Sequence, residues 1–143
     1  MRMSSQKLAR ARCASEALPT NHYAWFAAPA FERGETLRIA NLAPPCGVRA
    51  VAIRALDAAG IAWSEAFVGG GVAAVTAAVT AGLAVAALAR RIAPVGCIDV
   101  GPKLRLPRLP RARVMLYSRV SDARGRAAFR VLAAAFRGMA ASG

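Results

Sequence analysis

The sequence predicts an α/β fold with a largely parallel central sheet, and two observations lead to this expectation. Residues 66–89, AFVGGGVAAVTAAVTAGLAVAALA, carry no charged side chain and divide into strand end, glycine turn, helix, glycine stop and strand. Residues 37–67 follow the same plan, with a Pro-Pro-Cys-Gly corner in place of the glycine turn. Alternation of this kind is typical of parallel sheets, which bind ligands outside the carboxyl ends of their strands.

The uncharged stretch is long enough to cross a bilayer, so a membrane span is the competing interpretation. Its large apolar residues are only Phe67, Leu83 and Leu88, and the rest is mainly alanine, glycine, valine and threonine. A glycine triplet and two threonines lower the tendency to insert into lipid. We therefore expect a β-turn-α-turn-β unit in water and no membrane association. A single unbroken helix from 67 to 88 would refute this expectation.

The first half of the chain provides two strands, a corner and a helix. We expect strands at 23–28, where three aromatic residues precede Pro29, and at 37–42. The corner at 44–47 contains two prolines and is compatible with neither a helix interior nor a central strand. Helical periodicity begins at Val48, and Gly60 is expected just after the end of that helix. A third strand at 61–67 then leads into the glycine turn.

The helix after the glycine turn is expected at 72–81, with a buried stripe formed by Val72, Val75 and Val79. Gly82 is expected to end this helix because glycine readily adopts positive φ. The apolar segment 83–88 is short enough to form a buried strand.

The last third of the chain is expected to contain a short strand at 97–100, an extended connector at 104–113 and a strand at 114–117. A helix at 122–140 follows, capped by Ser121 or Asp122. Its apolar stripe is expected to consist of Phe129, Leu132 and Phe136.

The net charge of +13 is extreme and comes almost wholly from arginine. Between 101 and 143, Lys103 and nine arginines stand against Asp122 as the only acid. Such a charge favours anionic partners, so an anion-binding or nucleic-acid-binding protein acting through this third is the alternative function. No aromatic residues interleave with the arginines, and a solvated basic face is the simpler interpretation.

Cysteine and histidine usage restricts the chemistry. The three cysteines, Cys13, Cys46 and Cys97, form no CxxC pair, and His22 is the only histidine. This pattern argues against a zinc site and a disulfide framework, and it favours a reducing cytoplasm. Cys46 beside a helix start could be an activated thiolate, but it needs a neighbouring base. We expect no enzyme, no metal and no cofactor.

The chain length of 143 residues suits one domain with a core. Residues 1–20 contain four basic residues and lack the apolar core of a secretory signal. We expect them to be a poorly ordered basic lead-in.

The order of these motifs resembles the C-terminal two-thirds of the effector-binding domain of LysR-type transcriptional regulators. The likeness covers about residues 21–138 and rests on several segments in combination. These are YAWFAAP at 23–29, LAPPCGVR at 42–49, ALDAAG at 55–60 followed by Trp63, AAVTAGLAV at 77–85, and LPRLP at 106–110 with MLYS at 115–118.

The resemblance implies a periplasmic-binding-protein-like fold of type 2, in which a small-molecule effector such as a carboxylate lies between two α/β subdomains. Residues 21–110 would form one effector-binding subdomain. Residues 111–143 would supply the return strand and basic C-terminal helix of an incomplete second subdomain. Residues 1–20 are too short for the winged helix-turn-helix of the family, so this chain alone is expected to contact DNA only indirectly or non-specifically.

The two corners are the predicted ligand-binding site because parallel strands bring their carboxyl ends to one edge. A glycine turn before a helix also presents free backbone N–H groups that suit an anion. The predicted contacts are Pro45, Cys46 and Gly47 of the first corner, and the backbone of Val68, Gly69, Gly70 and Gly71 of the second. Where the family tends to have hydroxyl residues, this second corner has none. The alternative is that both corners are simply tight turns.

The resemblance leaves the return strand and last helix without their usual partner surface. They could repack on the remaining subdomain, pair with another copy as a homo-oligomer, or stay loosely attached, and the sequence does not choose between these outcomes.

Overall fold

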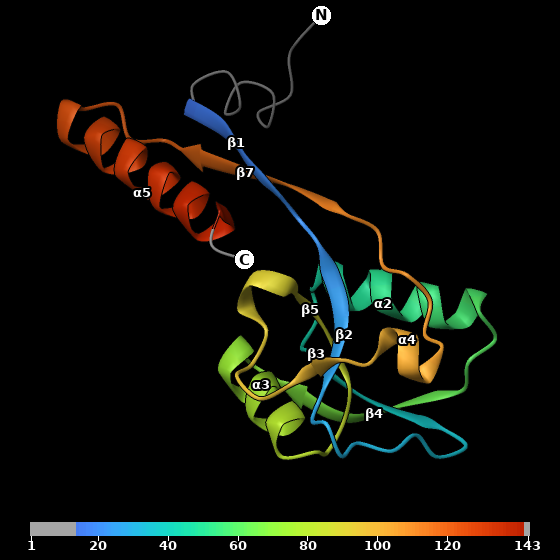
Figure 1. The fold of residues 1–143 in the computed structure, drawn as a ribbon. Helices are drawn as coiled ribbons and strands as arrows, with labels where there is room; N and C mark the ends of the chain where they lie inside the picture. The colour runs from blue at the N-terminus through green and yellow to red at the C-terminus, as the bar shows by residue number, and fades with distance from the viewer. Residues whose placement is uncertain (1–13, 142–143) are drawn as a thin grey trace, which may run out of the picture. The chain divides into compact units, whose positions relative to one another are not determined.

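A computed structural model describes residues 14–141, and the chain divides into two compact units. The central unit is His22–Arg111, and the described part of the terminal unit consists of 14–21 and 112–141. Figure 1 labels the elements of both units. The strands at the two ends of the chain pair with each other and form a separate cluster of contacts.

The central unit alternates strands and helices. Its elements in chain order are β2 (Tyr23–Ala27), β3 (Leu37–Leu42), α2 (Gly47–Ala58), β4 (Trp63–Gly69), α3 (Val72–Thr80), β5 (Ala86–Ala89), the 3-10 turn η1 (Arg90–Ile92), β6 (Ile98–Asp99) and α4 (Gly101–Leu104). All except η1 and α4 were predicted, with shifts at their ends. A turn as short as α4 carries no periodicity, although Pro102 in its first turn suits a helix start.

The strands of the central unit form a mixed sheet. β3 and β4 are parallel, and a parallel bridge from Ile39 to Val85 joins β3 to the chain just before β5. β2 pairs antiparallel with both β5 and β6. The α/β class is confirmed, but the parallel arrangement covers only the β4-β3-β5 side. β2 enters the sheet from the opposite end, and the loop 28–36 then turns the chain back into β3.

The central sheet is covered on both faces. One core cluster joins Leu56 of α2 to strand residues such as Ile39 and Val85, and the other joins Val79 of α3 to residues such as Ala86. Successive residues of β2 and β5 alternate between the two clusters, as a period of two requires. The side chains of Leu56, Ile39, Val85, Val79 and Ala86 are 0–1% exposed, so α2 and α3 bury opposite faces of one sheet.

Glycine ends both central helices as predicted. Gly60 has φ +67° after α2, and Gly82 has φ +77° after α3. The predicted stripe of α3 was only partly right, since Val75 and Val79 are buried whereas Val72 is 40% exposed. The apolar stretch 66–89 contains the end of β4, then α3, then β5, so it does not form one continuous helix. Among residues 14–141, no helix combines the length and apolarity needed to span a membrane.

The terminal unit contains one antiparallel strand pair and one helix. Its elements are β1 (Ala14–Asn21), β7 (Ala112–Ser118) and α5 (Ala123–Ala141). Asp122 caps α5, because its Oδ1 accepts a hydrogen bond from the Gly125 N–H at 2.6 Å. Phe129 and Phe136 of the predicted stripe are half-buried, whereas Leu132 is 46% exposed and Ala133 is the buried residue of α5 in its place.

The predicted lead-in at 1–20 is corrected in its second half. β1 begins at Ala14 and pairs with β7, with Leu18 opposite Val114. Leu18 is buried, which explains why this segment is ordered although it contains a proline and several polar residues. Residues 1–13, including Cys13, lie outside the described part of the chain.

Candidate functional site

The two predicted corners lie side by side. Leu42, the last residue of β3, pairs with Gly69, the last residue of β4, and the Ala43 N–H donates to the Gly69 carbonyl at 2.9 Å. The chain therefore leaves both parallel strands at the same point of the sheet edge. This confirms the predicted convergence of the corners, which is the arrangement that α/β sheets use to bind ligands.

Each corner leads into a helix whose N-terminus has no side-chain cap. Cys46 is the N-cap residue of α2 and Gly71 that of α3. The first hydrogen bonds to these N-cap carbonyls come from Ala50 and Val75, at 3.2 and 3.3 Å. The N–H groups of the preceding helical residues point out of each helix without an intrahelical acceptor. Two helix dipoles thus place their positive ends at one edge, which favours a bound anion.

The residues predicted at the first corner are accessible. Pro45 and Gly47 are exposed, and Cys46 is half-buried between them. The preceding Pro44–Pro45 peptide bond is cis. A ligand at the edge can therefore reach the backbone of this corner.

The four residues predicted at the second corner have different environments. Val68 is 50% exposed, whereas Gly69 is buried. A Cβ on Gly69 would lie 2.9 Å from Phe67 Cε1 and 3.2 Å from Ala74 Cβ, so this glycine permits close packing of β4 on α3. Gly70 and Gly71 are exposed, and a Cβ there would meet no atom within 4 Å. These two glycines leave the backbone open to solvent.

A group of polar side chains braces the first corner against β4. Arg49, in the first turn of α2, donates through Nε to Glu65 Oε2 at 3.1 Å and through Nη2 to Glu65 Oε1. The Asn41 amide also donates to Glu65 Oε2, at 3.1 Å. Asn41 is the buried polar residue of the described chain, at 5% exposure. The bidentate pair fixes the direction in which α2 leaves the edge.

These hydrogen bonds stabilise the charged forms of the pair. The pKa of Glu65 is lowered, mainly by the hydrogen bond from Arg49 and then by that from Asn41, while burial acts in the opposite direction. The hydrogen bond to Glu65 raises the pKa of Arg49. Sequence reasoning missed this group. A polar asparagine inside the apolar strand LRIANL was the available signal.

The described residues do not place the side chains for a metal site or for a thiol–histidine pair together at this sheet edge. Among the described residues, no group of three His, Cys, Asp or Glu side chains could hold a metal ion. Cys46 follows β3, whereas His22 precedes β2 and its carbonyl accepts from the Arg90 N–H. The central unit has cavities of about 580 and 680 Å³, and neither is lined by a corner residue.

The arginines between 112 and 141 are exposed along β7, the following loop and α5. Arg137 forms an ion pair with Glu16, and Arg126 donates to the Ser121 carbonyl. Such contacts use part of the positive charge to hold the terminal unit together.

No family model and no curated protein matches this sequence. Solved structures do match. The LysR family transcriptional regulator VV2_1132 has a TM-score of 0.59 at 13% identity, over 83% of this chain and 43% of that one. The regulatory domain of CcmR from Synechocystis PCC6803, in complex with 2-PG, has a TM-score of 0.59 at 13% identity, over 89% and 68%. The LysR family regulator HinK from Pseudomonas aeruginosa has a TM-score of 0.51 at 12% identity, over 89% and 49%.

This likeness identifies the fold. The chain spans 43–68% of the length of these three structures and has the mixed α/β fold of LysR regulatory domains over most of its own length. The predicted resemblance is thereby confirmed at the level of architecture.

Proposed function

We propose that this chain is the effector-sensing module of a LysR-type transcriptional regulator. We further propose that the corner edge, the sheet edge where residues 44–47 and 68–71 follow the paired ends of β3 and β4, holds a small anion such as a carboxylate. The observation that carries this proposal is the convergence of two uncapped helix N-termini on one sheet edge. Free N–H groups at helix N-termini bind carboxylates and phosphates without any charged side chain. The edge therefore suits anion recognition even though its second corner lacks hydroxyl side chains.

The LysR fold supports a sensing role for this edge rather than a catalytic one. The matched proteins are named as transcriptional regulators, and one of them is described in complex with 2-PG. We assign no catalytic role to Cys46, because a thiol nucleophile needs a nearby base and the chain's single histidine belongs to another segment. Arg49 and Glu65 act in this proposal as positioning residues for the first corner.

The direct test is a thermal-shift screen and calorimetric titration of the full chain with small carboxylates and 2-PG. Binding at 100 times Kd is expected to add about 2.7 kcal/mol to the free energy of unfolding. Gly71→Asp is expected to abolish this effect. Gly71 has φ −160° and ψ 164°, so an aspartate there can cap α3 and place its own carboxylate on the N–H groups.

Gly34→Asp is the matched control, because it adds the same charge to an exposed loop, where a Cβ would meet only the Thr36 carbonyl oxygen, at an ordinary contact distance of 4.0 Å. It is expected to bind as the wild type does. Absence of any stabilising anion for the folded protein, or equal binding by Gly71→Asp, would contradict an anion site at this edge.

A further inference from the structure

The strand β7 has one edge that no other strand covers. Within residues 14–141, the sheet of the terminal unit consists of β1 and β7 alone, and every pairing of β7 is with β1. Figure 1 shows these two strands side by side. The second edge of β7 therefore presents a row of backbone N–H and C=O groups that can pair with a further strand.

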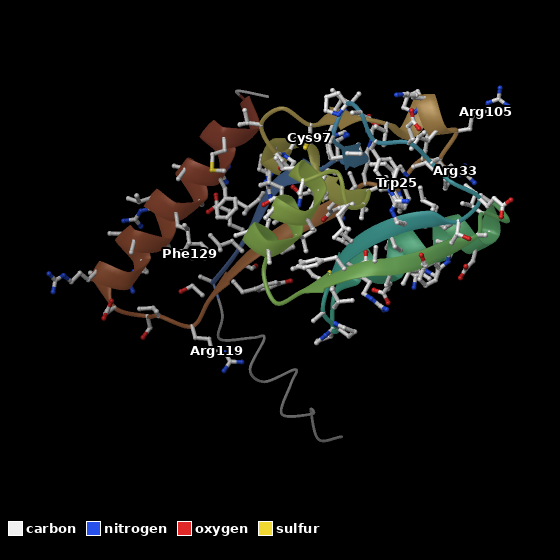
Figure 2. All side chains as sticks on the ribbon, turned by 90° about the horizontal axis from the view of Figure 1, so that it is seen from below. Trp25, Arg33, Cys97, Arg105, Arg119 and Phe129 are labelled. Carbon is white, nitrogen blue, oxygen red and sulfur yellow. The ribbon has the colours of Figure 1, made fainter. Side chains whose placement is uncertain are left out.

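The helix of this unit leaves that edge open. α5 packs mainly against β1 rather than β7. Leu18 of β1 is 8% exposed, whereas its partner Val114 on β7 is only half-buried. Figure 2 shows Phe129 on the side of α5 that faces the strand pair, while Arg119 extends away from the loop that follows β7. Another strand can thus reach the edge of β7 without displacing α5.

The sequence of β7 has little of the protection that exposed edge strands usually carry. Natural edges are commonly blunted by charged side chains or by proline. β7 is seven residues long, contains no proline, and has Arg113 as its only charged residue. Met115 and Tyr117 are 40% and 60% exposed. A mainly apolar strand would cover this surface, whereas an acidic strand would meet a single cation.

A second copy of β7 is such an apolar strand, because the sequence of β7 is complementary to itself. Two antiparallel copies are related by a two-fold axis, and opposite residues must point to the same face, so one residue lies opposite its own copy. With Met115 at the axis, Val114 lies opposite Leu116 of the second copy on the half-buried face. Arg113 then lies opposite Tyr117 of the second copy, where a guanidinium and an aromatic ring attract each other.

Charge favours this register over its neighbour. With Met115 at the axis, the two copies of Arg113 are four positions apart along the strands, which is roughly 13 Å. With Leu116 at the axis, Arg113 would lie opposite Arg119 of the second copy. Like charges directly opposite each other are destabilising. The strand can therefore pair with itself although the unit around it is rich in arginine.

We propose that β7 is a homodimer interface, at which two copies of this chain pair antiparallel along the free edge of β7 with Met115 at the two-fold axis. The result is a four-stranded sheet in the order β1-β7-β7-β1. Isolated two-stranded sheets are only marginally stable, so the pairing stabilises the terminal unit of each copy. The interface does not depend on the corner edge or on any ligand bound there.

The test measures the molar mass of the full chain by sedimentation equilibrium at several concentrations. The wild type is expected to form a dimer whose population rises with concentration. Met115→Lys is expected to weaken dimerisation at least about tenfold, because it places two ammonium groups opposite each other at the axis. Met115 is 40% exposed, so the variant is expected to keep the wild-type circular dichroism spectrum.

Met139→Lys is the matched control, because it makes the same exchange at a 52% exposed position of α5. It is expected to change the dimerisation constant less than about twofold. A monomer at every concentration, a dimer that Met115→Lys leaves intact, or an equal or larger loss in Met139→Lys would each overturn the proposal. The last result would place the interface on α5 instead.

Disulfide cross-linking with a mild oxidant tests the register independently. In a background in which Cys13, Cys46 and Cys97 are replaced by serine, Met115→Cys is expected to give a covalent dimer. Directly opposite residues have Cα atoms about 4.5–5.5 Å apart, which a disulfide can span. Arg113→Cys is expected to stay uncross-linked, because its two copies are too far apart. Equal cross-linking of the two variants, or none in Met115→Cys, would contradict the proposed pairing.

Discussion

The central unit and the terminal unit of this chain are built from the same kinds of elements, but they bury very different amounts of apolar surface. In the central unit, helices cover both faces of the sheet, and the core residues Leu37, Leu56 and Val79 are fully buried. In the described part of the terminal unit, residues 14–21 and 112–141, the buried hydrophobic residues are Leu18 and Ala133. Two strands and one helix cannot enclose a core, and such small assemblies are only marginally stable by themselves.

The strand pair of the terminal unit shows the difference directly. Along β7, half-buried residues alternate with exposed ones, and Met115 and Tyr117 are 40% and 60% exposed. Their partners across the pair, Ala17 and Ser15, are exposed too. Within this unit, one face of the pair meets α5 and the other is uncovered. The alternating pattern of β7 therefore predicts that one face of the strand pair is buried. It does not provide a second element that covers the opposite face.

The largest expected effect tests this contrast with two matched leucines. Leu56→Ala is expected to lower the free energy of unfolding by about 2–5 kcal/mol, because it empties a fully enclosed position. Leu132→Ala, at a 46% exposed position of α5, is expected to cost less than about 1 kcal/mol. Urea unfolding followed by tryptophan fluorescence measures the first, since Trp25 and Trp63 both lie in the central unit, and far-ultraviolet circular dichroism follows both. Equal losses would mean that the terminal unit has a core of its own.

The next effect compares the packed and open parts of the second corner. Gly69→Ala is expected to destabilise the protein by about 1–3 kcal/mol, because its Cβ would crowd Phe67, Ala74 and Val75. Gly70→Ala adds the same methyl group in open space and is expected to change stability by less than about 0.5 kcal/mol. Thermal unfolding of the two variants measures the difference. A Gly70→Ala variant as unstable as Gly69→Ala would show that the edge is not open.

The smallest expected effect concerns pH and the brace between α2 and β4. Because the pKa of Glu65 is lower in the folded state, the unfolded state binds more protons between the two pKa values, and stability rises with pH across that window. This contribution is complete above the unfolded pKa of about 4.3 and is lost as pH falls through the folded value. Glu65→Gln is therefore expected to be less stable than wild type at pH 7 and to lose less stability on acidification.

Urea unfolding at several values between pH 3 and pH 7 measures this pH dependence. Glu35→Gln is the matched control for loss of one acidic charge, at an exposed position outside the Arg49, Asn41 and Glu65 group. If Glu65→Gln lost as much stability at low pH as the wild type does, the hydrogen bonds from Arg49 and Asn41 would not favour the charged carboxylate.

Much of the central unit was predictable because its signals are local. Gly60 and Gly82 end their helices through positive φ, which is a property of a single residue. The shared plan of the two β-corner-α units placed both corners at one edge, and the paired ends of β3 and β4 confirm it. The binding role of those corners stays a prediction.

The features that the sequence did not predict depend on contacts between distant segments. The antiparallel course of β2 depends on its pairing with β5 and β6, and the order of β1 depends on β7, which lies about 100 residues further along the chain. Ala133 replaces Leu132 as the buried residue of α5 because the position of the neighbouring strand, not side-chain size, decides which residue faces it. No local pattern contains that information.

The sequence by itself determined the alternation of strands and helices, the glycine stops and the two corners, because each follows from the conformational preferences of neighbouring residues. Only the tertiary structure decided that Gly69 is a packing residue while Gly70 is open, and that Arg49 and Asn41 share Glu65. It alone left the second edge of β7 without a neighbouring strand within residues 14–141. These arrangements depend on which distant surfaces come into contact, since burial and hydrogen bonding act through space and not along the chain.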